Sequence, residues 1–178
     1  MSVTAIGRWM RTAAVVAGVL AAASGCSKTE SAAAAANSAP VSNTGAGAGC
    51  TGHAVCADNF FIDAVAPDAC AVGAVCNVAF KLVATGAFHV NDDYPYRFKA
   101  TDAPGIAFAG TDAAGKNVFS KPAGDWKKTD EKAGAMTVKF TAQDKGQKTI
   151  AGTLKLSVCS AATCLLEQRE VSAVVSAR

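Results

Sequence analysis

Two cysteines near the C-terminus, Cys159 and Cys164, have the clearest chemical potential in this chain. Small or polar residues separate them, and apolar and polar residues alternate over residues 149–159, as in a half-buried strand. A second β-rich run, residues 165–175, follows the pair. The pattern therefore predicts a hairpin in which the two sulfur atoms face each other across the turn, close enough for a disulfide.

Thiol–disulfide exchange needs one accessible, partly ionised sulfur and a second cysteine that resolves the mixed disulfide. The turn predicts access to the pair, although the loop contains no Lys, Arg or His that would favour a thiolate. As a staple, a loop of this size contributes only about 2 kcal/mol through chain entropy. This small value favours a redox role for Cys159 and Cys164, and a structural disulfide is the alternative.

The chain has seven cysteines, of which Cys26 ends an N-terminal signal. The others, apart from Cys159 and Cys164, are Cys50, Cys56, Cys70 and Cys76. An even number in an exported chain indicates disulfides, and the five-residue gaps within each pair are wider than the gaps of about two to four residues in zinc sites. We predict no metal and three local disulfides, with Cys50–Cys56 and Cys70–Cys76 structural. The sequence leaves the other connectivities open.

The N-terminus has the features of an export signal. Arg8 and Arg11 precede an uncharged apolar stretch, residues 12–23, which is too short to cross a bilayer. Because the signal ends in Gly-Cys, it resembles a bacterial lipoprotein signal, in which the cysteine becomes the acylated first residue. We predict a signal peptide over residues 1–25 and lipidation of Cys26; an ordinary signal peptide is the alternative.

Residues 26–49 are rich in Ala, Gly and Ser, which predicts a flexible tether with a mean reach of about 26 Å. The folded domain is expected over residues 50–178. These features predict a location in the bacterial cell envelope, with the protein facing the periplasm and held to a membrane by its lipid. Ser27 stands where well-known sorting rules place the Asp of inner-membrane lipoproteins, which favours the outer membrane.

Charge and motifs exclude several classes of function. The net charge is +3, and +1 without Arg8 and Arg11, so no basic field for nucleic acid is expected. The sequence has no Ser-His-Asp set, phosphate-binding loop or recognisable carboxylate pair, and we expect no cofactor.

The elements that must position the cysteine pair are almost all strands. Apolar and polar residues alternate in short runs separated by turn signals such as Asn-Asp-Asp and Asp-Lys-Gly. The expected strands are residues 59–65, 74–84, 94–100, 106–109, 117–120, 136–142, 149–159 and 165–175. Seven to eight such strands predict an all-β, immunoglobulin-like antiparallel β-sandwich.

Two segments carry a resemblance to a known family. Residues 86–99 read Gly-Ala-Phe-His-Val-Asn-Asp-Asp-Tyr-Pro-Tyr-Arg-Phe-Lys, and residues 152–165 contain a strand followed by Cys159 and Cys164. Together they resemble the N-terminal periplasmic domain of the thiol:disulfide interchange protein DsbD, over about residues 57–176. In that family an immunoglobulin-like sandwich carries two redox cysteines on a C-terminal hairpin, and these pass electrons to thioredoxin-like proteins of the periplasm.

The resemblance implies that Cys159 and Cys164 are the redox pair and that the partner is a thioredoxin-like or other periplasmic redox protein. It also implies that aromatic side chains shield the pair, and the candidates are Tyr94, Tyr96 and Phe119. Phe119 belongs to residues 118–126, the closest counterpart of the family's cap loop.

This sequence departs from the family in three ways. Leu-Leu-Glu follows Cys164 where the family usually has an aromatic residue and prolines, and residues 118–126 lack the acidic, aromatic pattern of the cap loop. It also contains neither the electron-carrying membrane region nor the thioredoxin-like domain. The sequence therefore predicts a single relay in a longer pathway, a lipid-anchored thiol–disulfide exchange protein. The alternative is a redox-inert β-sandwich lipoprotein of the envelope, with structural disulfides, that binds a protein partner.

Overall fold

The computed structural model describes residues 52–178, and this part of the chain is all β, with thirteen strands and no helix. The all-β, antiparallel prediction is confirmed. No helix of this part of the chain is long and apolar enough to cross a membrane. Residues 1–51 lie outside the described range, so the signal peptide, Cys26, the tether and Cys50 stay predictions.

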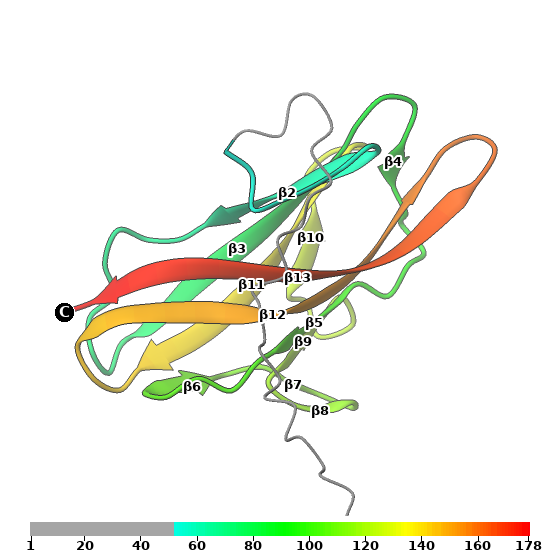
Figure 1. The fold of residues 1–178 in the computed structure, drawn as a ribbon. Coiled ribbons are helices and arrows are strands. Elements are labelled where there is room, and N and C mark those ends of the chain that lie inside the picture. Colours follow the sequence, from blue (N-terminus) through cyan, green and yellow to red (C-terminus); the bar gives the residue numbers. More distant parts are fainter. Residues whose placement is uncertain (1–51) are drawn as a thin grey trace, which may run out of the picture. The chain divides into compact units, whose positions relative to one another are not determined.

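The strands form two main antiparallel sheets and one small hairpin (Figure 1). The first sheet contains β1 (Val55–Ala57), β2 (Phe60–Val65), β3 (Val75–Ala84), β11 (Ala133–Ala142) and β10 (Trp126–Lys128) in that order, and β6 (Ile106–Phe108) also pairs with β11. The second contains β13 (Cys164–Ala177), β12 (Gly146–Cys159), β5 (Arg97–Ala100) and β9 (Val118–Ser120), and β4 (His89–Val90) also pairs with β12. The small hairpin is β7 (Thr111–Asp112) and β8 (Gly115–Lys116).

All eight predicted runs contain a strand. In the run predicted over residues 94–100, the strand β5 begins only at Arg97, since residues 94–96 do not pair with a neighbouring strand. The strand count exceeds the predicted seven to eight because β1, β4, β7, β8 and β10 were not predicted. Each has only two or three residues, too few to show a period of two in the sequence. The immunoglobulin-like arrangement of the strands stays a prediction.

Alternation along the strands builds a common core. Val78, Phe80 and Leu82 of β3 are fully buried, and Leu154 and Leu156 of β12 are fully buried in the second sheet. The rings of Phe80 and Phe98 join the two sheets, with centroids 5.1 Å apart. These contacts are those of a β-sandwich, in which each buried apolar side chain stabilises the fold by about 1.5–3 kcal/mol.

The hairpin of β12 and β13 is the longest element, with 14 residues in each strand paired from Gly146–Ala177 to Cys159–Cys164. Its tip lies beside β4, at the upper right of Figure 1. Close packing against β5 requires Gly152, because a Cβ there would lie 2.3 Å from the Lys99 carbonyl oxygen. Pairing with β5 thus fixes the middle of the hairpin in the second sheet, and the turn at its tip extends beyond the last strand pairing.

The disulfide between Cys70 and Cys76 lies away from that tip, near the C-terminus, and confirms the predicted pairing. Cys70 is only 1% exposed. Its amide donates to the Ser176 carbonyl at 2.8 Å, and its carbonyl accepts from the Arg178 amide at 2.9 Å. The bond therefore ties the end of β13 to β3, which is a structural position.

Candidate functional site

Cys159 and Cys164 are joined in a disulfide across the hairpin, as the sequence predicts. They are directly opposed in the β12–β13 register, with Cα atoms 4.0 Å apart. The Ser160 amide donates to the Thr163 carbonyl at 2.7 Å, so the next pair toward the tip is hydrogen-bonded and the cysteines occupy a non-hydrogen-bonded pair. Side chains approach most closely at such a pair, which brings the sulfur atoms together.

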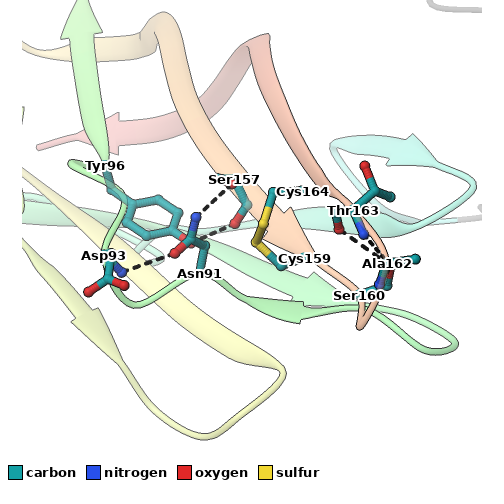
Figure 2. The surroundings of a disulfide bond; sticks show 9 residues. All are labelled: Asn91, Asp93, Tyr96, Ser157, Cys159, Ser160, Ala162, Thr163 and Cys164. Carbon is teal, nitrogen blue, oxygen red and sulfur yellow. Dashed lines mark hydrogen bonds between the residues drawn. A yellow bond between two sulfur atoms is a disulfide. The ribbon is translucent and has the colours of Figure 1, made fainter.

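The turn beyond the disulfide is closed by the side chain of Ser160 (Figure 2). Its Oγ accepts hydrogen bonds from the amides of Ala162 and Thr163, at 3.3 and 3.2 Å. Small side chains at Ala161 and Ala162 leave the end of the hairpin sterically open. The turn therefore holds the cysteines in place without covering them.

The two cysteines differ in exposure. Since Leu156 and Val158 point into the core, Ser157 and Cys159 point to the outer face of the second sheet. Cys159 is only 6% exposed, whereas Cys164 is exposed. One sulfur-bearing side chain is thus open to a reagent and its partner is shielded.

Residues 91–96, which we call the cover segment, lie beside Ser157 at the edge of β12 that pairs with β4 and β5, two residues before Cys159 (Figure 2). The Tyr96 hydroxyl donates to the Ser157 carbonyl at 2.6 Å, and Asn91 Nδ2 donates to Ser157 Oγ at 3.2 Å. The Asn91 amide also donates to the Ser157 carbonyl, at 3.3 Å. These bonds bury Ser157, two residues before Cys159, and fix the segment to the strand that carries the shielded cysteine.

An aromatic stack holds the cover segment from beneath. The Tyr96 ring is fully buried and lies 3.9 Å from the Trp126 ring at an angle of 7°, and the Tyr94 ring meets Tyr96 edge-on at 5.3 Å. Trp126 itself lies against Gly134, where a Cβ would be 2.3 Å from the indole. Burial raises the pKa of Tyr96 well above its ordinary value, so its hydroxyl remains a hydrogen-bond donor at physiological pH.

Charged groups fasten the exposed side of the cover segment. Lys128 Nζ donates to the Asp92 carboxylate at 2.6 Å, and Lys121 Nζ donates to the Asp92 backbone carbonyl. The hydrogen bond from Lys128 is the main reason that the pKa of Asp92 lies below its ordinary value. The segment is therefore anchored by its backbone, its rings and this carboxylate.

The structure places the remaining predicted residues as follows. Phe119 lies in the core, with its ring centroid 6.2 Å from Phe98 and 6.4 Å from Phe108. Residues 118–126, considered as the cap loop, form β9, a turn and the start of β10. Cys56 is disulfide-bonded, and because Cys50 lies outside the described residues, the Cys50–Cys56 pairing stays a prediction.

One neighbour of the pair was not identified from the sequence. His89 in β4 is directly opposite Cys159 in the register, although its surroundings in the sequence indicate only an edge-strand histidine. Directly opposed residues place their side chains on the same face of a sheet, so an imidazole stands beside the shielded cysteine. An imidazole there can exchange a proton with a thiol. No signal in the sequence pairs a two-residue strand with β12.

Within residues 52–178, no group of three or more His, Cys, Asp or Glu side chains is arranged to hold a metal ion. Comparison with known protein families and with curated proteins gives no match for this chain. The hairpin tip, with its disulfide, is therefore the part of the described structure from which we infer a function.

Proposed function

We propose that this protein is a lipid-anchored thiol–disulfide exchange protein of the bacterial periplasm and that Cys159 and Cys164 are its reactive pair. The observation that carries the proposal is the unequal exposure of the two cysteines at the hairpin tip. Cys164 is exposed, whereas Cys159 is 6% exposed beside the cover segment. Exchange requires this division between a sulfur that meets the partner and one that resolves the mixed disulfide.

The reaction transfers two electrons from a protein dithiol. A partner thiolate attacks Sγ of Cys164, which forms a mixed disulfide and releases Cys159 as a thiolate. The second thiol of the partner then loses its proton to solvent, and its thiolate attacks the partner's own sulfur in the mixed disulfide. Cys164 leaves as a thiolate, and both cysteines take up protons. The partner ends as a disulfide and this protein as a dithiol, which can reduce a second protein disulfide by the reverse steps.

The surroundings of Cys159 suit its part in this reaction. His89, opposite in the register, is placed to donate a proton to the thiolate released at Cys159. We expect the cover segment, fixed to Ser157 two residues before Cys159, to limit access to this sulfur, so that attack is directed to Cys164. A thioredoxin-like protein of the periplasm is the expected partner, and a lipid on Cys26 with the tether would keep the domain close to the membrane, which we propose is the outer membrane.

The Cys70–Cys76 bond supports the assignment by contrast. Its Cys70 is buried, its Cys76 is half-buried, and the bond ties the chain terminus to β3, whereas the Cys159–Cys164 bond closes a turn that backbone and Ser160 hydrogen bonds already close. Chain entropy gives both bonds a similar small stabilisation of about 2 kcal/mol, since their loops are of similar length, so the contrast lies in what each bond connects.

The deciding experiment is a redox titration of the mature protein in dithiothreitol buffers, with alkylation and mass spectrometry of each cysteine. We expect Cys159 and Cys164 to be reduced at a potential above about −300 mV, before Cys70 and Cys76. A potential below that value would favour the alternative, a redox-inert sandwich lipoprotein. A Cys70→Ser/Cys76→Ser variant that remains folded is the matched control and should leave the Cys159–Cys164 potential unchanged.

A further inference from the structure

A cluster of cations lines a hollow on the outer face of the second sheet, the face that carries the reactive pair. The hollow has a volume of about 330 Å³. Its lining residues are Arg97, Lys99, Ala114, Val118, Thr153, Lys155 and Gln168. The charged side chains in this lining are all cations: Arg97, Lys99 and Lys155. Thr153 and Gln168 beside them can form hydrogen bonds.

The strand register concentrates this positive charge. Arg97 is directly opposite Lys155, and Lys99 is opposite Thr153. Like charges directly opposite each other destabilise a sheet. Arg97 Nε lies 3.3 Å from the Asp112 carboxylate and makes no hydrogen bond, and among the described residues Lys155 makes no ion pair. The fold therefore carries a charge cluster that its own carboxylates only partly neutralise.

The hollow is continuous with the surface next to the disulfide. A second, shallower hollow of about 210 Å³ is lined by Tyr94, Lys155, Leu166, Glu167 and Gln168, so Lys155 and Gln168 belong to both. Leu166 is 69% exposed and opposite Ser157, one same-face position from the cysteines. We call Leu166, Gln168, Lys155, Arg97 and Lys99 the docking face.

The spacing along the strands gives the reach of this face. Residues on one face of a strand repeat every two positions, about 6.6–6.8 Å. Lys155 is therefore about 13 Å from Cys159 along β12, and Thr153 about 20 Å. Beyond Lys155 the cationic stretch ends at Glu170, a carboxylate that accepts a hydrogen bond from Thr153.

We propose that the docking face binds an acidic segment of the redox partner, with its carboxylates in the basic hollow while its reactive cysteine meets Cys164. This inference rests on the proposed function. The partner carries Asp or Glu residues about 13–20 Å from its reactive cysteine, next to an apolar contact for Leu166. Arg97 suits carboxylates because a guanidinium can donate two parallel hydrogen bonds, and the cluster accelerates encounters with an acidic surface.

The test uses synthetic peptides that carry one cysteine, a flexible spacer that spans about 13–20 Å, and a tail of glutamates, glutamines or lysines. Mixed-disulfide formation with the mature protein is timed at low ionic strength. We expect the glutamate peptide to react about 10-fold faster than the glutamine peptide, and the lysine peptide to react more slowly. Screening by about 0.5 M salt should remove these differences.

The variant Lys99→Gln/Lys155→Gln should remove the advantage of the glutamate peptide and leave reduction by uncharged dithiothreitol unchanged. Its matched control is Lys127→Gln/Lys139→Gln, which removes the same charge from exposed positions of the first sheet and should keep the advantage. Equal rates for the glutamate and glutamine peptides, or equal loss in both variants, would overturn the docking proposal.

A serine analogue of the glutamate peptide separates docking from exchange. Its binding, followed by fluorescence anisotropy, should weaken in Lys99→Gln/Lys155→Gln and not in the control variant. Binding of this kind in a protein whose disulfide exchanges with neither peptide nor dithiothreitol would support the docking face and refute the proposed function. Exchange with no preference for the acidic peptide would support the proposed function and refute the docking face.

Discussion

The hydroxyl of Tyr96 provides the sharpest test of shielding at the hairpin tip. Tyr96→Phe removes only the oxygen that donates to the Ser157 carbonyl at 2.6 Å, and it keeps the ring that stacks on Trp126. Loss of a buried hydrogen bond costs about 1 kcal/mol, and an unsatisfied buried carbonyl adds up to about 1–3 kcal/mol. Because the Asn91 amide still donates to this carbonyl, we expect a total near the lower end, about 1–2 kcal/mol.

Two measurements read the effect of Tyr96→Phe. Urea unfolding should show the loss of about 1–2 kcal/mol, and thermal unfolding a midpoint lower by about 3–8 °C. Where the lost bond also releases the cover segment, the same energy corresponds to about 5–30-fold faster attack at Cys159, measured as the mixed disulfide that a monothiol forms on Cys159 rather than on the exposed Cys164. Tyr94→Phe is the matched control, because the Tyr94 hydroxyl makes no hydrogen bond among the described residues.

The outcomes divide clearly. If Tyr96→Phe behaved like Tyr94→Phe in both measurements, the assigned role of the hydroxyl would be refuted. A loss of stability with an unchanged rate of attack at Cys159 would refute shielding by the cover segment, while the hydrogen-bond energy would stand.

Three further predictions concern the anchors of the cover segment. Gly134→Val should lower stability by about 1–3 kcal/mol in thermal unfolding and speed attack of a monothiol at Cys159, because a Cβ would lie 2.3 Å from the Trp126 ring that supports Tyr96; an unchanged melting temperature would contradict this packing. Since Lys128 lowers the pKa of Asp92 from 3.8, the bond between them contributes stability above pH 3.8 that is lost as the pH falls further. Asp92→Asn removes this bond at neutral pH and should speed attack of a monothiol at Cys159; equal rates in wild type and variant would count against this anchor. Burial raises the pKa of Tyr96 above 10.0, so the hydroxyl of the unfolded state loses its proton first and the stability of the wild type falls as the pH rises through 10. The urea midpoints of wild type and Tyr96→Phe should therefore converge at alkaline pH. A constant difference would show that the hydroxyl ionises equally in the folded and unfolded states.

The parts of the fold that the sequence predicts are those set by local interactions. The alternation of Val78, Phe80 and Leu82 predicts β3, and the same pattern with a tight turn predicts the hairpin and its disulfide. The predicted strand over residues 94–100 began three residues too early. Tyr96 is buried because it stacks on Trp126, and it takes no part in strand pairing. An alternating aromatic pattern is the same in both cases, so periodicity could not separate them.

By itself, the sequence determined an all-β antiparallel domain and a disulfide at a hairpin tip, since side-chain alternation and turn chemistry act between near neighbours along the chain. Only the tertiary structure decided what surrounds that disulfide. It brings the Tyr96 hydroxyl to the Ser157 carbonyl across 61 residues, His89 opposite Cys159, and Arg97 opposite Lys155. These neighbours depend on which distant strands pair and in what register, and that choice is made by burial of the whole core.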